Sequence, residues 1–141
     1  MLSGNEKRLE GMKQTIAALK QALDLVTDAV VITDTAGSVV YQNAASKELH
    51  QTGQDDEVTM MLANDHDGWR MADHWFRPIE KSMLPLQLAR QEAFGPQDVL
   101  IKNENATFIA AYSGMPVKGP DGKTSSLVLV INNVRTSNQD E

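Results

Sequence analysis

The chain has 141 residues, of which 41% are hydrophobic and 23% charged, and this length suits one globular domain with its own core. Its formal net charge of −6 argues against nucleic acid as a partner, because phosphate binding needs clustered Lys and Arg. The chain contains no Cys and no apolar run of about 18 residues, so we expect neither disulfides nor a membrane span, and we place the domain in the cytoplasm.

The first segment, residues 1–27, is predicted to be an amphipathic helix. Residues 5–26 contain no Pro, and hydrophobic side chains recur in alternating steps of three and four. These seam positions are Leu9, Met12, Ile16, Leu19, Leu23 and Val26. A stripe this narrow is typical of a coiled coil, so we expect a homodimer held by this signalling helix. The alternative is a helix that lies on its own domain.

A β-hairpin and a short helix are expected next. Ala29–Thr33 is short and β-branched, which favours a strand, and Ser38–Gln42 is a second strand. Between them, Asp34–Gly37 predicts a turn, because Asp can bond its own backbone and Gly accepts positive φ. Asn43 suits the N-cap of a helix over Ala44–His50.

The middle of the chain, residues 54–82, has the weakest pattern. Val58–Ala63 is compatible with one or two helical turns, and Trp69–Phe76 with an extended piece. Leu84–Phe94 is predicted to be a helix that ends at the Gly-Pro pair after it. We therefore expect this region to supply short helices.

Three strands end the domain. Val99–Lys102 and Thr107–Val117 come first, and Ser126–Val134 is the last strand, after a Pro-Asp-Gly turn. Strands on both sides of a helical middle predict an α+β fold: a five-stranded antiparallel sheet with short helices on one face. The domain is expected over residues 28–135, followed by a disordered polar tail over 136–141.

Two stretches carry a characteristic order of turns and caps. They are Ile32-Thr33-Asp34-x-x-Gly37-x-Val39-x-Tyr41-x-Asn43-x-Ala45 and Ser113-x-x-Pro116-Val117-x-x-x-Asp121-Gly122. In this order and spacing they resemble the PAS domain. The resemblance implies a sensory module of bacterial signalling proteins such as sensor histidine kinases of two-component systems. It implies an output domain or partner signalling protein outside this chain, and no enzymatic activity in the module itself.

The end of the last strand departs from this resemblance. PAS domains often close with an Asp-Ile/Val-Thr triplet that couples the sheet to the next signalling helix, whereas here the residues are Asn133, Val134 and Arg135. Asn keeps the hydrogen-bonding ability but lacks the charge. The expected signal path therefore shifts toward the N-terminal helix.

Cofactor chemistry is limited by the residue types present. Photo-adduct PAS domains need a Cys, and haem-binding PAS domains resemble one another in a His on the middle helix, which Leu84–Phe94 lacks. We therefore expect no covalent chromophore and no His-ligated haem. Trp69 and Trp75 could stack on a ring system, which leaves non-covalent flavin open beside a plain structural role. The His residues match no metal-site spacing, so we assign neither a metal nor a catalytic residue.

A ligand pocket is expected between the sheet and the helices, and such pockets are mostly apolar. Candidate lining residues are Ile32, Leu62, Trp75, Leu88, Ile109 and Leu129. Each of them is equally suited to plain core packing. Two functions therefore stay open: a sensor that binds a small ligand or partner and signals through paired helices, or a ligand-free dimerisation and interaction domain.

Overall fold

The computed structural model describes residues 4, 14, 17–73 and 75–136, and these contain one antiparallel sheet in the strand order β2-β1-β6-β5-β4-β3. The strands are β1 (Ala29–Thr33), β2 (Val39–Gln42), β3 (Trp69–Ala72), β4 (Phe94–Asn103), β5 (Thr107–Lys118) and β6 (Thr124–Thr136). The helices are α2 (Ala44–His50), α3 (Asp55–Leu62), the 3-10 helix η1 (Lys81–Met83) and α4 (Pro85–Gln91), and a further helix at the N-terminal side includes residues 17–24. No helix within the described residues is long and apolar enough to cross a membrane.

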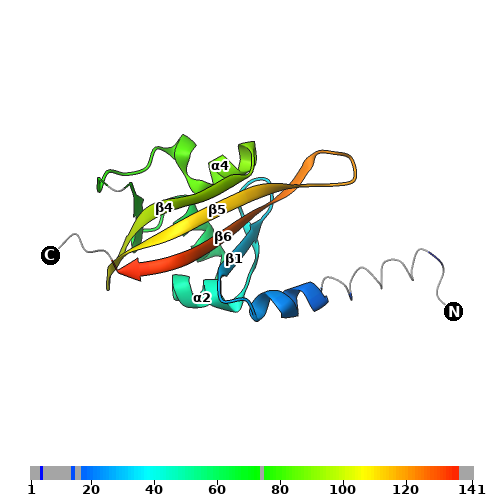
Figure 1. Ribbon diagram of the computed structural model, residues 1–141, viewed down its shortest axis with the longest axis horizontal. Helices are drawn as coiled ribbons and strands as arrows, with labels where there is room; N and C mark the ends of the chain where they lie inside the picture. Colours follow the sequence, from blue (N-terminus) through cyan, green and yellow to red (C-terminus); the bar gives the residue numbers. More distant parts are fainter. Residues whose placement is uncertain (1–3, 5–13, 15–16, 74, 137–141) are drawn as a thin grey trace.

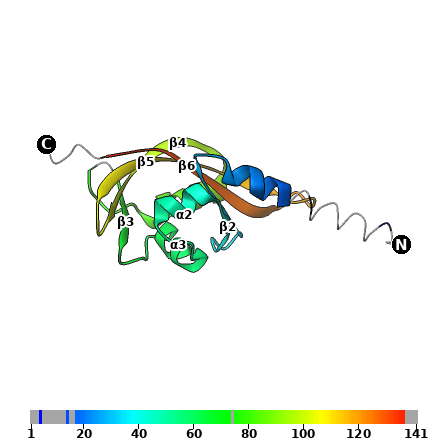
Figure 2. The same ribbon diagram turned by 90° about the horizontal axis from the view of Figure 1, so that it is seen from below.

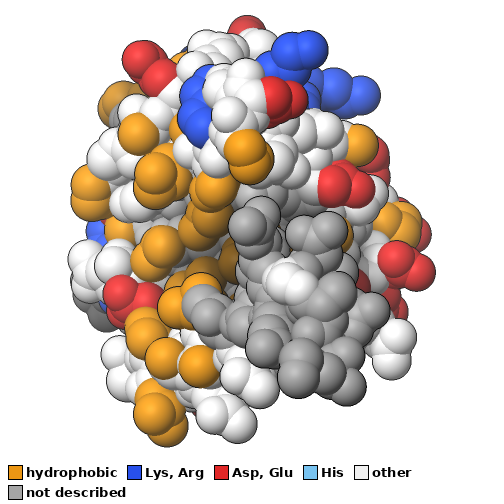
Figure 3. All heavy atoms as spheres, turned by 90° about the vertical axis from the view of Figure 1, so that its right-hand side faces the viewer, with side chains coloured by type: hydrophobic (Ala, Val, Ile, Leu, Met, Phe, Trp, Pro, Cys, Tyr) orange, Lys and Arg blue, Asp and Glu red, His pale blue; other side chains and the backbone are white. Residues whose placement is uncertain are grey.

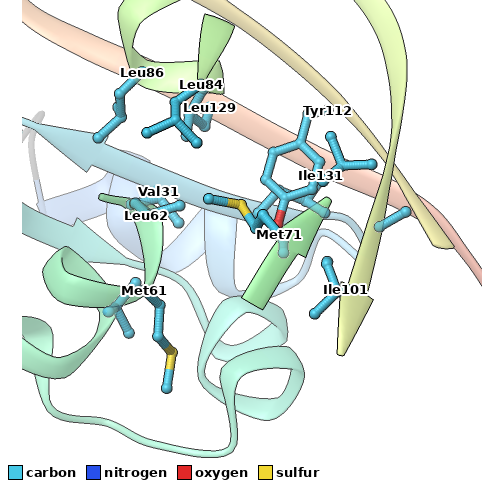
Figure 4. Packing of buried hydrophobic residues seen from close by; sticks show 14 of the residues in the cluster. Val31, Met61, Leu62, Met71, Leu84, Leu86, Ile101, Tyr112, Leu129 and Ile131 are labelled. Atoms are coloured by element: carbon cyan, nitrogen blue, oxygen red, sulfur yellow. The ribbon is translucent and has the colours of Figure 1, made fainter. Parts of the chain in front are cut away.

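Helices α2 and α3 lie on one face of the sheet, as the two perpendicular views show (Figures 1 and 2). The hydrophobic core fills the space between these layers, because alternate residues of each strand point toward the helices. In β1 the core residues are Ala29 and Val31, and in β6 they are Leu127, Leu129 and Ile131. Figure 4 shows strand and helix side chains of this cluster packed together.

The sheet has six strands rather than the predicted five. The additional strand is β3, which pairs with β4 at one edge of the sheet. Its inward-facing residues Trp69 and Met71 are both buried in the core. The free edge is covered by Asn64, whose side chain donates to the Met71 carbonyl (3.2 Å) and accepts from the Met71 N–H (2.9 Å).

The helix predicted over Leu84–Phe94 is shorter in the structure. Helix α4 ends at Gln91, and β4 already begins at Phe94 and includes the Gly-Pro pair. The β4–β5 ladder shifts its register between Phe94 and Gln97. Such an irregularity tolerates Pro, which has no N–H to donate to a strand ladder.

Both predicted turns are confirmed. The Asp34 carboxylate accepts hydrogen bonds from the N–H groups of Ala36 (3.0 Å) and Ser38 (2.9 Å), and Gly37 has a φ of 95°. In the β5–β6 hairpin, Gly122 has a φ of 79°. Both Gly residues occupy left-handed backbone that a side chain would strain.

The last strand ends in a bulge at the triplet that departs from the PAS pattern. Asn133 has a φ of 51°. Opposite it on β5, Ala111 pairs with Asn132 and Ile109 pairs with Arg135, so the β5–β6 register shifts between these two pairs. Asn tolerates this left-handed conformation better than most residues. Beyond the bulge, the Arg135 guanidinium lies 2.6 Å from the Asp98 carboxylate, so the end of β6 is bound back to β4.

Candidate functional site

The side chain of Asn43 joins three elements at the N-terminal end of α2. Its oxygen caps α2 by accepting from the N–H of Ser46 (3.0 Å), and it also accepts from the N–H of Val30 in β1 (2.9 Å). Its amide group donates to the carbonyls of Leu23 and Asp28, each at 2.9 Å. Asn43 is fully buried, and these four bonds use its two donors and both acceptor positions.

Side chains around Asn43 extend this contact along the N-terminal helix. The Asp24 carboxylate accepts from the N–H of Ala44 (2.9 Å) and lies 3.3 Å from the Tyr41 hydroxyl, which is also 3.2 Å from the Lys20 carbonyl. The Lys20 ammonium lies 5.7 Å from the centre of the Tyr41 ring. The pKa of Tyr41 is raised, mainly by burial of the hydroxyl and secondly by the neighbouring Asp24 carboxylate. We call Lys20, Leu23, Asp24, Asp28, Tyr41 and Asn43 the helix junction.

A line of buried polar side chains continues from the junction along α2. The Gln42 amide donates to the Asp55 carboxylate at the start of α3 (3.1 Å), and its oxygen accepts from the Ser46 hydroxyl (2.8 Å). His50 Nδ1 lies 2.9 Å from the Ser46 carbonyl. A carbonyl can only accept, so Nδ1 carries the proton and Nε2 keeps its lone pair in the neutral ring. Burial lowers the pKa of His50 to about 4 even though the bond to Ser46 opposes this shift.

His50 lies next to Trp69 at the end of the sheet where α2 stops, with 5.1 Å between the ring centres. Both side chains are 2% exposed, and together they line a cavity of about 200 Å³, which we call the His50 pocket. The other lining residues come from the segment after α2, from α3, from the loop before β3, and from the end of β4 and the turn that follows it. They are Gln51, Thr52, Glu57, Met61, His66, Gly68, Asn103, Glu104 and Asn105.

Three buried side-chain polar atoms have no hydrogen-bond partner within the described part of the chain: His50 Nε2, Trp69 Nε1 and Tyr112 Oη. The first two belong to residues of the His50 pocket. Tyr112 is not among the residues that line this pocket; it belongs to the core cluster, where Figure 4 shows its side chain. Burial strongly raises the pKa of Tyr112. Unpartnered buried polar groups are uncommon in folded proteins, so two at one cavity mark it as a candidate binding site.

The structure does not gather the six residues predicted to line a pocket. Leu62 and Leu129 lie in the core cluster, and Leu88 is half-buried on α4. Ile32 and Ile109 are half-buried on the opposite face of the sheet, because their neighbours Val31 and Ala110 are the ones that face the core. Trp75 is 65% exposed.

Sequence reasoning missed His50 and Trp69 as partners in one site. A signal for His50 was present, because Ser46 and His50 are four residues apart and so share one face of the predicted helix. Both are buried, which is unusual for polar residues on a short helix. Trp69 carried no comparable signal, since it was equally suited to the core.

The expected dimer seam is only partly described. Leu9, Met12 and Ile16 lie outside the described residues, as do residues 137–141 of the expected tail, while Thr136 ends β6. Of the remaining seam residues, Leu19 is 57% and Val26 41% exposed, whereas Leu23 is half-buried. Figure 3 shows hydrophobic side chains gathered in a band on this end of the molecule.

The chain matches no sequence-family model and no curated protein. It does resemble solved structures of PAS domains. The PAS domain of nitrogen regulation protein NR(II) from Vibrio parahaemolyticus is 14% identical with a TM-score of 0.53, over 80% of this chain and 94% of that one. The PAS domain of the fruit-fly ELK potassium channel is 13% identical with a TM-score of 0.55, over 83% and 94%.

A domain of a sensory box sensor histidine kinase/response regulator from Geobacter sulfurreducens gives a similar result. It is 14% identical with a TM-score of 0.56, over 86% of this chain and 96% of that one. At these identities the likeness concerns the fold. The chain therefore has the PAS fold, in agreement with the resemblance that its turn and cap motifs indicate.

Proposed function

We propose that the chain is a sensory signalling module in which the helix junction passes changes in the domain core to the N-terminal helix. The observation that carries this proposal is the buried side chain of Asn43, which binds α2, β1 and the end of the N-terminal helix at once. The similar PAS domains support such a role, because two of them come from a nitrogen regulation protein and a sensor histidine kinase.

The junction is suited to transmission because its bonds are buried and mutually dependent. A displacement of α2 or β1 that broke one bond of Asn43 would leave a donor or acceptor unsatisfied, at about 1–3 kcal/mol for each group. The end of the N-terminal helix would therefore move with the core. Signalling also requires two arrangements whose balance the cue changes, and a pair of helices can supply them.

The N-terminal helices of two copies would form that pair, held through the seam from Leu9 to Val26. Exposed apolar side chains at Leu19 and Val26 support this arrangement. The output would lie in another domain of a longer protein or in a partner signalling protein of two-component type. The module itself would carry no catalysis, bind no nucleic acid and work in the cytoplasm.

Charges placed in the seam test the dimer. Ile16→Asp with Leu19→Asp should give a folded monomer, measured by light scattering alongside circular dichroism. The matched control is Gln14→Asp with Gln21→Asp, which adds the same charge on the opposite side of the heptad and should stay dimeric. A seam variant that remains dimeric would exclude this helix as the main interface. A seam variant that unfolds would show that the helix belongs to the core of its own domain.

The second candidate function is a ligand-free interaction domain. It is favoured by the core cluster, which already contains Leu62 and Leu129, two residues predicted to line a pocket. Native mass spectrometry after gentle purification separates the two functions, because it reports bound mass and oligomeric state together. A dimer without bound mass that also fails to bind small molecules would favour the interaction domain.

A further inference from the structure

We propose that the His50 pocket binds a small cationic molecule that carries a hydroxyl or amide group. Such a ligand would supply the cue for the sensory role proposed above, and its signalling consequence rests on that role. Three features of the pocket lead to this ligand class: two ring nitrogens of its lining that have no partner among the described residues, the charge of the residues around them and the size of the cavity.

The ring nitrogens define which polar group fits. His50 Nδ1 is committed to the Ser46 carbonyl, so Nε2 offers a lone pair and needs a donor. Trp69 Nε1 can only donate, so it needs an acceptor. A hydroxyl or a carboxamide supplies both a donor and an acceptor within a few atoms, and because both nitrogens are buried, side chains of the lining must move to admit it. A purely apolar ligand would give neither nitrogen a hydrogen-bond partner.

The remaining lining residues determine which ligand charge the pocket favours. Glu57 and Glu104 both border the pocket and are exposed, while no Lys or Arg is found among the described residues of its lining. Two carboxylates in a partly enclosed cavity favour a cation over an anion. The volume of about 200 Å³ holds roughly six or seven waters. The pocket therefore suits a small amine with one further polar group rather than a large ring system such as flavin.

The pocket and the helix junction lie at opposite ends of the same helix. His50 is the last residue of α2 and Asn43 is its cap, and Ser46 lies between them with bonds to both. Helix α2 has seven residues, which at 1.5 Å per residue is about 10 Å. A ligand that bonded His50 would thus act on a rigid element whose other end holds the N-terminal helix.

Amide NMR of the full chain tests the proposal directly, because the indole N–H of each Trp gives its own signal. The probes are ethanolamine, ethylamine, which lacks the hydroxyl, and glycolate, which has the hydroxyl but the opposite charge. Ethanolamine should shift the Trp69 indole signal and bind more tightly than the other two. The exposed Trp75 indole serves as the internal reference. No saturable Trp69 shift with ethanolamine, or equal binding of either other probe, would overturn the ligand class.

A charge variant distinguishes the pocket from general attraction to an acidic protein. Glu57→Gln with Glu104→Gln should weaken ethanolamine binding by about tenfold and leave the fold intact, because both side chains are exposed. The matched control, Glu48→Gln with Glu92→Gln, removes the same charge at exposed positions outside the pocket and should change binding less than twofold. Equal weakening by both variants would contradict the assignment.

The same spectra separate this inference from the sensory function. If ethanolamine shifts Trp69 together with the backbone amides of Leu23 and Asn43, both the pocket and the transmission through α2 are supported. If it shifts Trp69 alone, the pocket stands and transmission to the N-terminal helix is wrong. If the Trp69 signal does not respond, the ligand proposal fails, and the junction remains open to its own tests.

Discussion

At the N-terminal end of α2, Asn43 makes four hydrogen bonds, whereas at the C-terminal end His50 and Trp69 each have a buried nitrogen without a partner within the described residues. Both ends are buried to a similar degree. Burial alone therefore does not separate a structural polar group from a candidate binding group. The satisfied end is suited to holding elements in one arrangement, and the unsatisfied end to gaining stability when a ligand arrives.

Removal of the satisfied network should have the largest effect. Asn43→Ala takes away the α2 cap and leaves the Val30 N–H and the Leu23 carbonyl without their side-chain partner. We expect a loss of about 3 kcal/mol or more in the free energy of unfolding, measured by urea denaturation. Asn105→Ala, at an exposed loop position, should change it by less than about 0.5 kcal/mol. If Asn43→Ala lowered the free energy of unfolding by less than about 1 kcal/mol, the contrast between the two ends of α2 would be wrong.

The next largest effect should come from a decrease in pH, which lowers the stability of the folded protein through His50 at the C-terminal end of α2. Above pH 6.5 His50 is neutral in both states, but below it the unfolded chain binds a proton that the folded protein, with a pKa of about 4, does not. Stability should therefore fall as the pH decreases, by about 2 kcal/mol between pH 7 and pH 5.

The control for this pH effect is His50→Gln, whose amide can still donate to Ser46 but does not titrate. It should lose most of the decrease, while His66→Gln should keep it. The pocket is also bordered by Glu57, Glu104 and His66. The His50→Gln variant keeps these three residues, so any pH dependence that they cause remains in it. Urea denaturation at a series of pH values is the measurement. An unchanged pH dependence in His50→Gln would show that other groups cause it.

A smaller effect is expected from Tyr41→Phe, which removes the hydroxyl contacts to Lys20 and Asp24. Tyr41 is half-buried, so the loss of stability should be about 1 kcal/mol or less. Hydrogen exchange should become faster at the amides of residues 17–24 and remain the same in the sheet. Equal changes in helix and sheet would mean that the junction does not act locally.

The smallest effect should come from the matched substitution Tyr112→Phe. Its hydroxyl is buried and unpartnered among the described residues, so its removal deletes no bond. Thermal unfolding should show an unchanged or slightly more stable protein, and exchange in the N-terminal helix should not change. A clear loss of stability would reveal a partner for Tyr112 and weaken the same reasoning for His50 and Trp69.

Much of the fold could be predicted because local chemistry determines it. The turns at Asp34–Gly37 and Gly122 and the cap at Asn43 depend on residues within four positions of one another, and all three are confirmed. The edge strand β3 was harder to predict, because four residues carry too little alternation to distinguish a strand from a loop. Its strand conformation depends on pairing with β4, which is about 30 residues later in the chain.

The sequence by itself determined where the chain turns, where α2 begins and which residues alternate along a strand. It did not determine which face of a strand is covered, since Val31 and Ile32 are equally apolar and only helices from elsewhere in the chain decide that Val31 is inside. The tertiary structure alone brings Asn43 to the Leu23 carbonyl, 20 residues away, and His50 to Trp69. Contacts between distant segments depend on the packing of the layers, and a single sequence carries no local signal for them.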